Sequence, residues 1–311
     1  MTPPDTRTVF LVNPAAANGS TGRRWPELAR RAAAAGLEGS TLFSERPGHL
    51  AELAREAALD GAGRLVVVGG DGSVNEVANG LAGIGATPEV AVVARGTGWD
   101  FVRTFGIPRK IEQAAEVALE GEVRAIDLGR VTYRAWDGSE ATSVFANVAS
   151  AGMSGAIAKR ANETTKMLGG KASYLWATFA VFSQWQASEI ELLVDDERRT
   201  GRMFDVVAAN GRFFGGGLQI CPEASPEDGL LDVLTIGDIT KRDLVLTMPK
   251  IYRGTHLPHP KAELLRGSTV TISSDSPLPI ELDGEQPGTT PVRLDVLSGA
   301  LRLRVPRRVS S

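Results

Sequence analysis

The clearest candidate for chemistry is a loop of three glycines and one acid, Gly69-Gly70-Asp71-Gly72. A short apolar run, residues 65–68, precedes it and an amphipathic helical pattern follows, so we predict a buried strand, a turn and a helix. Glycine lets the backbone approach a ligand closely, and a helix N-terminus offers free N–H groups, which together suit a phosphate. Asp71 would repel that phosphate unless Mg²⁺ or a protonated group lay between them.

The start of this helix carries its own signal. Ser73 is a good N-cap residue, and Glu76 three positions later would complete a capping box. A tight turn in an ordinary α/β domain explains the same pattern equally well, because glycine motifs are weak evidence in isolation. Ligand binding therefore has to be argued from the rest of the chain.

Composition limits the possible classes of protein. A chain of 311 residues is long enough for two domains, and its net charge of −3 predicts no nucleic-acid partner. A single cysteine, Cys221, excludes a disulfide within the chain and favours the cytoplasm. The N-terminus lacks a signal peptide pattern, and the most apolar helical stretch, 174–185, is about half a membrane span. We therefore expect a cytoplasmic protein with no transmembrane segment, touching membranes from one side at most.

The order of the predicted elements divides the chain. Residues 1–128 alternate strands with helices, which predicts an α/β domain with a mostly parallel sheet. Strands dominate residues 129–290, which predicts a β-rich, largely antiparallel domain interrupted by helices at about 172–185 and 241–252. Residues 291–311 are expected to form a C-terminal hairpin around Ser298-Gly299, with packing against the first domain as one option.

Four motifs occur in a fixed order along the chain: GGDGS at 69–73, GTGWDF at 96–101, CPEASPEDGLLDV at 221–233 and LDGE at 282–285. NPxxxxG at 13–19 and Pro-Gly-His at 47–49 accompany them. GGDG[TS] is shared by diacylglycerol-type lipid kinases, NAD kinases and phosphofructokinases, but the whole set resembles the bacterial diacylglycerol kinase and YegS-like lipid kinase family. The resemblance implies an NAD kinase/diacylglycerol kinase-like fold of two domains with the active site in the interdomain cleft. It also implies transfer of the γ-phosphate of ATP, with Mg²⁺, to the hydroxyl of diacylglycerol or a related lipid alcohol.

The resemblance also implies roles for individual residues. Glu285 would be the general base that takes the proton from the acceptor hydroxyl, and Asp71 would act in catalysis beside the Mg²⁺. Asp100 and Asp127 would join Asp71 in an acidic network at the nucleotide. The remaining nucleotide-binding set would be Ser44, Gly69, Gly70, Gly72, Ser73, Val74, Asn75 and Thr97. A separate Mg²⁺ would be held by Asp228 and the carbonyls of Ser225 and Leu230.

Two positions depart from the family pattern: Trp99 replaces the usual Asn before Asp100, and Ala94 replaces a Pro. Trp99 favours a homologue that binds nucleotide or lipid without catalysis, which stays open beside the lipid kinase. An NAD kinase shares GGDG and is the other alternative, although the motifs at 221–233 and 282–285 argue against it. The expected partner is a lipid substrate at the inner membrane face, consistent with a role in phospholipid biosynthesis. The lipid itself and the oligomeric state stay open, with a homodimer among the options.

Overall fold

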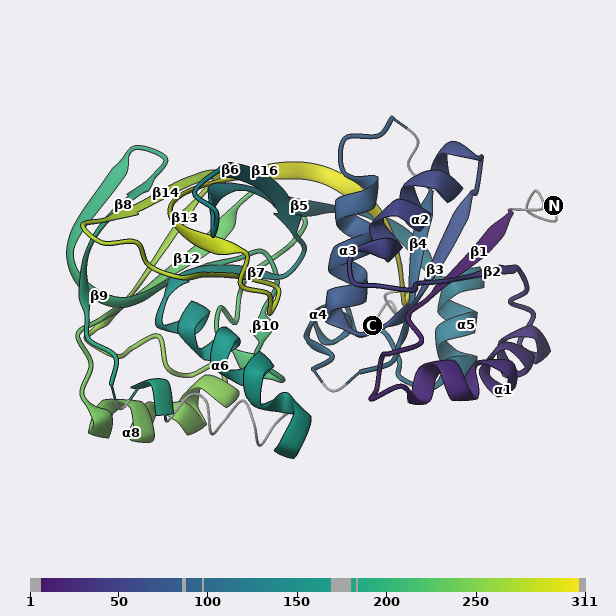
Figure 1. Ribbon diagram of the computed structural model, residues 1–311, viewed down its shortest axis with the longest axis horizontal. Coiled ribbons are helices and arrows are strands. Elements are labelled where there is room, and N and C mark those ends of the chain that lie inside the picture. The colour runs from purple at the N-terminus through teal and green to yellow at the C-terminus, as the bar shows by residue number, and fades with distance from the viewer. Residues whose placement is uncertain (1–6, 86–87, 97, 169–179, 183, 308–311) are drawn as a thin grey trace. The chain divides into compact units, whose positions relative to one another are not determined.

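The computed structural model describes residues 7–85, 88–96, 98–168, 180–182 and 184–307. The chain forms two compact units, Met1–Ile126 with Ser298–Ser311 (unit 1) and Asp127–Leu297 (unit 2), which are described separately (Figure 1). Unit 1 has a parallel sheet with helices, and unit 2 is built mainly from antiparallel strands. This confirms the predicted combination of an α/β part and a β-rich part.

The sheet of unit 1 contains β1 (Thr8–Val12), β2 (Ser40–Phe43), β3 (Arg64–Gly69) and β4 (Glu89–Ala94), in the order β4-β3-β1-β2. The helices are α1 (Ser20–Ala34), α2 (His49–Leu59), α3 (Asp71–Leu81), α4 (Asp100–Thr104) and α5 (Ile111–Glu120). Helices α1 and α5 cover one face of the sheet, and α2 and α3 cover the other (Figure 1). Phe10 and Val66 pack with Trp25 and Leu28 on the first of these faces. Because both faces are covered, strands β1, β3 and β4 are mainly apolar and buried, whereas the edge strand β2 is partly exposed.

Two helix starts differ from the predictions. Proline is favoured in the first turn of a helix, which predicts a helix from about Pro26 to Ala35. Helix α1 instead begins at Ser20, and Pro26 lies inside it. Helix α3 begins at Asp71 with Gly70 as N-cap, and no side chain caps it. The predicted capping box is therefore wrong, because both of its side chains have other partners. The Ser73 hydroxyl accepts a hydrogen bond from Asn13 Nδ2 at 3.1 Å, and Glu76 accepts one from the Leu50 N–H at 3.0 Å.

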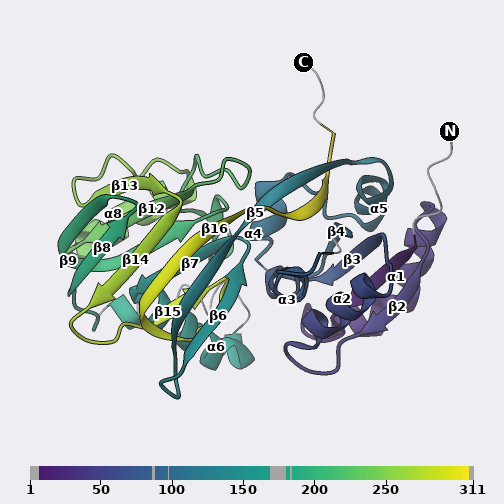
Figure 2. The same cartoon turned by 90° about the horizontal axis from the view of Figure 1, so that it is seen from above.

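Unit 2 is organised around strands in the order β13-β12-β9-β8-β14-β16 (Figure 2). Strand β7 pairs with β9 and β15, β5 pairs with β6 and β16, and β10 and β11 form a separate pair. Their bounds are β5 (Glu122–Ala135), β6 (Glu140–Phe145), β7 (Val148–Gly152), β8 (Ser188–Val194), β9 (Glu197–Ala209), β10 (Phe213–Phe214), β11 (Leu218–Gln219), β12 (Leu231–Gly237), β13 (Ala262–Gly267), β14 (Thr269–Ser274), β15 (Ile280–Leu282) and β16 (Gly288–Val305).

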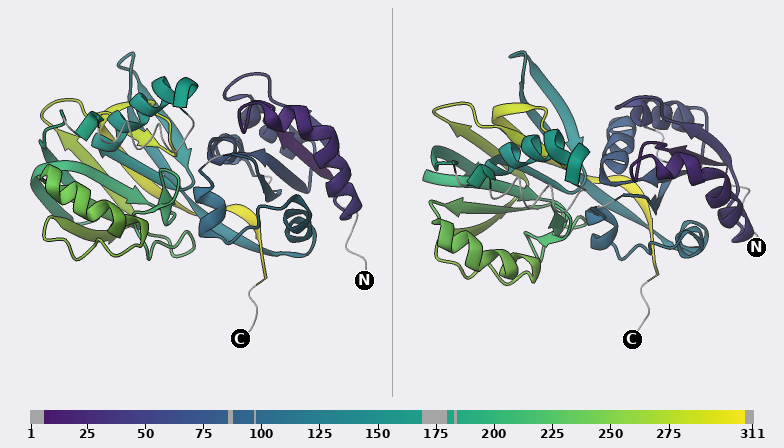
Figure 3. Two further views of the ribbon diagram at one scale, coloured as in Figure 1. Left: turned by 90° about the horizontal axis from the view of Figure 1, so that it is seen from below. Right: turned by 60° about the horizontal axis from the view of Figure 1, so that its bottom comes forward.

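Helices α6 (Met153–Leu168) and α8 (Lys241–Tyr252) lie on the same side of these strands (Figure 3). Met153 of α6 and Leu244 of α8 pack with Phe204 of β9 in one apolar cluster. Helix α8 has the predicted bounds and is capped by Thr240, which accepts the Asp243 N–H. Helix α6 was not predicted, and most of the expected helix at 172–185 lies outside the described residues.

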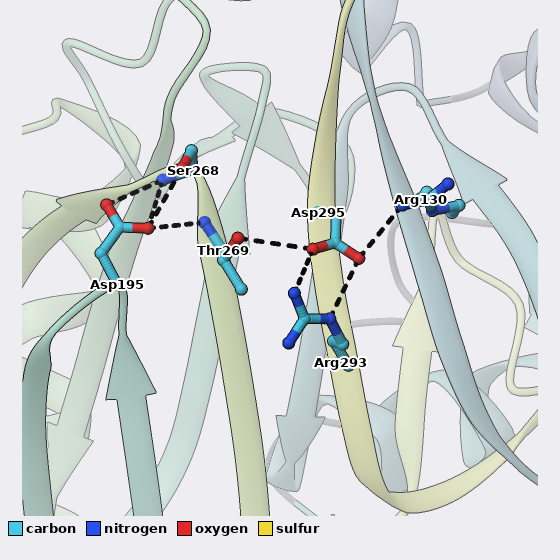
Figure 4. Close-up of polar contacts among 6 residues, drawn as sticks. All are labelled: Arg130, Asp195, Ser268, Thr269, Arg293 and Asp295. Carbon is cyan, nitrogen blue, oxygen red and sulfur yellow. Dashed lines mark hydrogen bonds and ion pairs between the residues drawn. The ribbon is translucent and has the colours of Figure 1, made fainter.

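Asp195 fixes the turn between β8 and β9 (Figure 4). Its carboxylate accepts hydrogen bonds from the Ser268 N–H at 3.1 Å and the Thr269 N–H at 2.9 Å, which ties the turn to the start of β14. On β16, Asp295 pairs with Arg293 at 2.8 Å and with Arg130 of β5 at 3.4 Å. These contacts fix which residues of neighbouring strands face each other.

The expected C-terminal hairpin is wrong, because β16 is one continuous strand through Ser298-Gly299. A Ser-Gly pair between apolar runs is typical of a hairpin turn, but here the two halves have different partner strands. Val292 pairs with β14 of unit 2, whereas Leu303 pairs with β4 of unit 1. Arg304 adds an ion pair to Glu89 of β4 at 2.8 Å. Strand β5 likewise runs from one unit into the other.

Candidate functional site

The carboxyl ends of the parallel strands in unit 1 bring several predicted site residues to one edge of the sheet. Asn13, Ser44, Gly69 and Arg95 each end or directly follow one of the strands β1 to β4. The backbone N–H of Ser44 donates to Val12 at 3.0 Å, and that of Arg95 donates to Gly69 at 2.6 Å. In open α/β sheets this edge is where ligands bind. The sequence motifs predict no site role for Asn13, although a position directly after a parallel strand indicates one.

Asp71 joins the two glycine loops of unit 1. Its two carboxylate oxygens accept the backbone N–H of Trp99 at 2.9 Å and that of Phe101 at 3.0 Å, at the start of α4. A Cβ at Gly98 would lie 2.5 Å from Asp71 Oδ2, so the loops approach this closely only with glycine there. Each carboxylate oxygen keeps a second lone pair, so a cation beside Asp71 is compatible with these contacts.

Trp99 is held by its own loop and by Arg109. Its backbone has a φ of 69°, which is uncommon for a bulky residue. The indole N–H donates to the carbonyl of Gly96. The guanidinium of Arg109 lies 3.2 Å from the centre of the ring, a cation–π contact. Stacking of this Trp on a ligand would thus have to use the ring face that Arg109 leaves open.

Most of the other nucleotide-site predictions fall on α3 and α4. Val74 is buried, so it can offer only its backbone, and Asn75 accepts a hydrogen bond from Asn79 Nδ2 at 3.1 Å. Asp100 is 5 % exposed and pairs with Arg103 at 2.8 Å. Gly70 and Gly72 flank Asp71 in the first turn of α3. Thr97 lies outside the described residues.

Asp127 belongs to unit 2, whereas Asp71 and Asp100 belong to unit 1. Its carboxylate accepts the backbone N–H of Gly229 at 2.8 Å, and its own N–H donates to Pro226 at 2.7 Å. Asn210 donates to the Asp127 carbonyl at 2.8 Å. Within unit 2, Asp127 therefore holds the loop that carries Asp228, and its place in one network with Asp71 stays a prediction.

The predicted base, Glu285, lies exposed on a tight turn of unit 2. Leu282 and Glu285 exchange two backbone hydrogen bonds, of 2.8 and 2.9 Å, which close the turn. Asp283, at a φ of 48°, accepts the backbone N–H groups of residues 146, 147 and 148 at 2.7 to 2.9 Å. The sequence could not reveal this role of Asp283, because its partners lie more than 130 residues away.

The predicted Mg²⁺ position in unit 2 contains a cation of the protein itself. Asp228 pairs through one oxygen with Arg266, and its other oxygen accepts the Leu230 N–H at 3.1 Å. Arg266 also bonds Asp232 at 3.0 Å, whose side chain is only 4 % exposed. Burial raises the pKa of Asp232, and Arg266 opposes that shift. The donor set with Ser225 and Leu230 therefore does not fit a metal as it stands, because Arg266 supplies the positive charge.

We expect Arg266→Met to lower the melting temperature by several degrees, because Asp232 would lose the partner of a nearly buried carboxylate. The wild-type melting temperature should not respond to Mg²⁺, whereas that of the variant should recover partly when Mg²⁺ is added. Thermal melting of both proteins, with and without Mg²⁺, checks this. A wild-type increase with Mg²⁺ that Asp228→Ala abolishes would instead place the predicted metal at Asp228.

Unit 2 also contains a deep apolar pocket that the sequence did not reveal. It has about 830 Å³ of space free of protein atoms, including its open mouth, and lies between α6, α8, β9 and β12. Most of its lining residues are apolar, with Ile157, Leu234 and Leu244 among them. Ser154, Asp205 and His256 are the buried polar residues in its wall. Its lining is typical of sites that bind an apolar ligand with a few polar contacts.

Comparison with known proteins assigns the family. The diacylglycerol kinase catalytic domain matches residues 7–131, and the YegS C-terminal NAD kinase beta sandwich-like domain matches residues 147–305. A Pseudomonas aeruginosa protein named "Probable lipid kinase YegS-like" is 32% identical over 273 residues, covering 88% of this chain and 86% of the relative. The chain belongs to the YegS-like lipid kinase family. This confirms the predicted resemblance and makes the protein a lipid kinase.

Other relatives of this lipid kinase agree with the assignment. A diacylglycerol kinase of Bacillus subtilis is 26% identical and covers 92% of the chain and 91% of the relative. A solved diacylglycerol kinase from Bacillus anthracis has a TM-score of 0.74 at 21% identity, with 98% of each chain covered. Yeast NADH kinase shares the fold more distantly, with a TM-score of 0.55 at 12% identity over 99% of this chain and 88% of that one.

Among the described residues of the lipid kinase, no helix combines the length and apolar character required to cross a bilayer.

Proposed function

We propose that this lipid kinase transfers the γ-phosphate of ATP to the hydroxyl of diacylglycerol or a related lipid alcohol, with Glu285 as general base. The observation that carries the proposal is the exposed carboxylate of Glu285 on a turn that Asp283 holds with three backbone hydrogen bonds. Phosphoryl transfer requires positioning, neutralisation of charge and an oriented hydroxyl. A carboxylate held in this way suits the last of these tasks.

The nucleotide would bind at the carboxyl edge of the unit 1 sheet. Gly69, Gly70 and the first turn of α3 would contact the phosphates, with Ser44 and Asn13 beside them. The backbone of a glycine loop and a helix N-terminus favours phosphate, and Asp71 would help to hold the Mg²⁺ that neutralises it. This ion would supply charge neutralisation when bound, while the contacts of Asp71 to Trp99 and Phe101 keep the two loops together.

The acceptor would place its hydrocarbon chain in the apolar pocket of unit 2. Three large apolar residues of α8, the helix that lines this pocket, are about half exposed: Val245 at 54 %, Leu246 at 57 % and Tyr252 at 48 %. Exposed apolar side chains of this kind suit contact with a lipid surface. They support the proposal that the enzyme collects its substrate at the membrane, working from the cytoplasm.

We expect radiolabelled ATP with Mg²⁺ to label a lipid alcohol in mixed micelles, and this is the direct test. The acceptors would be diacylglycerol and a panel of related lipid alcohols, with NAD in a parallel reaction. Label in a lipid supports the proposal, because an apolar pocket suits a hydrocarbon chain and does not suit a charged dinucleotide. Label in NADP alone would assign the NAD kinase reaction. ATP binding by calorimetry without any transfer would indicate a non-catalytic homologue, the alternative that Trp99 raises.

A further inference from the structure

A buried chain of polar groups connects the apolar pocket of unit 2 to the turn that carries Glu285. Ser154 and Asp205 form part of the pocket wall. The Ser154 hydroxyl lies 2.9 Å from Asp205 Oδ1 and 2.5 Å from the hydroxyl of Ser150, which lies 2.9 Å from Glu281 Oε2. The other carboxylate oxygen of Glu281 accepts the backbone N–H of Gly284, in the middle of the turn.

The chain is shielded from solvent and closely fitted. Ser150, Ser154, Asp205 and Glu281 are each 2 to 4 % exposed. A Cβ at Gly152, where φ is 127°, would lie 2.9 Å from Asp205 Oδ1 and 2.7 Å from the Phe204 carbonyl. Only glycine fits this close approach of β7 to β9. Buried polar chains of this kind are stable only when every member has its hydrogen bond.

If both carboxyl groups are ionised, the chain has too few hydrogen atoms to make all of its hydrogen bonds. The chain has three oxygen–oxygen contacts between Glu281 and Asp205, but the two serine hydroxyls can donate only one hydrogen bond each. A proton on Glu281 supplies the third, so that Glu281 donates to Ser150, Ser150 to Ser154, and Ser154 to the Asp205 carboxylate. Asp205 is the better place for the negative charge, because it also accepts the Ser154 N–H at the start of α6, at 3.0 Å.

We propose that Glu281 is a positioning residue for the Glu285 turn, and that the chain Glu281–Ser150–Ser154–Asp205 holds one shared proton. The positioning role of Glu281 rests on the proposed role of Glu285 in catalysis. Burial raises the pKa of both carboxyl groups, Glu281 and Asp205, to about 8, which favours keeping a proton in the chain at neutral pH. The number of protons, one, comes from the three oxygen–oxygen contacts.

The charges around the chain are few. Asp283 adjoins Glu281 and raises its pKa further, after burial itself. The pocket that contains Asp205 also contains the titratable side chains Asp243, His256, His259 and Lys261. On α6, Lys159 and Arg160 are exposed. Among the described residues that line the pocket, none places a buried cation beside the two carboxyl groups. A proton is therefore what neutralises one of them.

The pH dependence of the free energy of unfolding shows whether the folded protein holds this proton. Carboxyl groups in an unfolded chain have a pKa of about 4, so the folded state alone keeps the shared proton between about pH 4.5 and 8. In this range, each increase of one pH unit should therefore raise the ratio of the wild-type unfolding equilibrium constant to that of Glu281→Gln about tenfold. Gln donates to Ser150 as protonated Glu281 would, so the variant needs no extra proton. Equal pH dependence of the two proteins would overturn the proposal.

A second variant tests whether one proton is shared. Glu281→Gln and the double variant Glu281→Gln/Asp205→Asn should show the same pH dependence of unfolding, because the single variant already lacks the proton. A further tenfold difference per pH unit between them would mean two separate protons and would contradict the shared one. Glu140→Gln, an exposed carboxylate on β6, is the matched control for bulk effects of pH.

The positioning role is tested on the turn itself. Glu281→Leu removes the acceptor of the Gly284 N–H, so amide hydrogen exchange in residues 282–285 should accelerate at least tenfold, whereas Glu281→Gln should keep the protection. In the micelle assay, kcat should fall at least tenfold in Glu281→Leu, with an unchanged KM for ATP. The kcat of Glu281→Gln should stay close to that of the wild type. Unchanged exchange in Glu281→Leu would overturn the positioning role. Altered exchange without any effect on kcat would instead place the failure in the proposed role of Glu285.

Discussion

Replacing Glu285 with Gln is expected to reduce kcat by roughly 10²–10⁴-fold, about 3–5 kcal/mol of transition-state stabilisation. A lipid hydroxyl is a weak acid, and its proton must leave as the oxygen attacks the γ-phosphate. Gln preserves the size of the side chain but cannot accept that proton. The turn should be unaffected, since its hydrogen bonds come from the backbone of Leu282 and Glu285 and from the Asp283 carboxylate, none of which the substitution changes.

The Glu285→Gln experiment combines two measurements: kcat in mixed micelles and ATP affinity by calorimetry. ATP affinity should stay close to that of the wild type, because both glycine loops belong to unit 1 and Glu285 belongs to unit 2. Glu140→Gln again serves as the control for loss of an exposed carboxylate. A kcat of Glu285→Gln within about fivefold of the wild type would be outside the general-base range, and would make Glu285 a turn residue without a role in proton transfer.

Asp71→Asn should lower kcat by roughly 10²-fold or more while the protein stays folded. The Asp71 carboxylate accepts two backbone N–H groups of the second glycine loop, at 2.9 and 3.0 Å. Asn can accept only one of them, and its own NH₂ group would face the other donor. The loops would then separate, and the negative charge that would hold Mg²⁺ would be lost as well.

Thermal melting separates the two effects of Asp71→Asn. Loss of one hydrogen bond should cost about 1–3 kcal/mol, a modest decrease in melting temperature that leaves most molecules folded at assay temperature. Asp60→Asn, whose side chain is 73% exposed and pairs with Arg7, is the matched control in the same unit. Wild-type kcat together with an unchanged melting temperature would show that Asp71 only occupies a turn.

Local sequence patterns were sufficient for the two-part fold, and for many of its elements. Alternating strands and helices predicted the parallel sheet, because parallel strands need crossover connections that are usually helices. The strand that ends at Gly69 and the helix at 241–252 could be predicted because hydrophobic patterning is a property of neighbouring residues. The Ser298-Gly299 pair misled the prediction, because a strand that changes partners has the same local pattern as a hairpin.

The site was predictable where it depends on glycines and turns, and not where it depends on distant partners. The motifs identified Asp71 and Glu285 as candidates, but not the N–H groups of Trp99 and Phe101 that Asp71 holds. Nor did they indicate that Arg266 pairs with Asp228, because the two residues are 38 positions apart. Pairing between strands determines such contacts, and one sequence records it only weakly.

The pairing of Leu303 with β4 also affects how the protein is made. Synthesis proceeds from the N-terminus, so β1 to β4 are complete long before the residues that cover the outer side of β4 leave the ribosome. Until then β4 is an open edge strand whose free N–H and C=O groups can pair with another chain. Unit 1 therefore reaches its final sheet only after residues 302 and 303 have been synthesised, and a nascent chain stalled before residue 302 would expose that edge to aggregation.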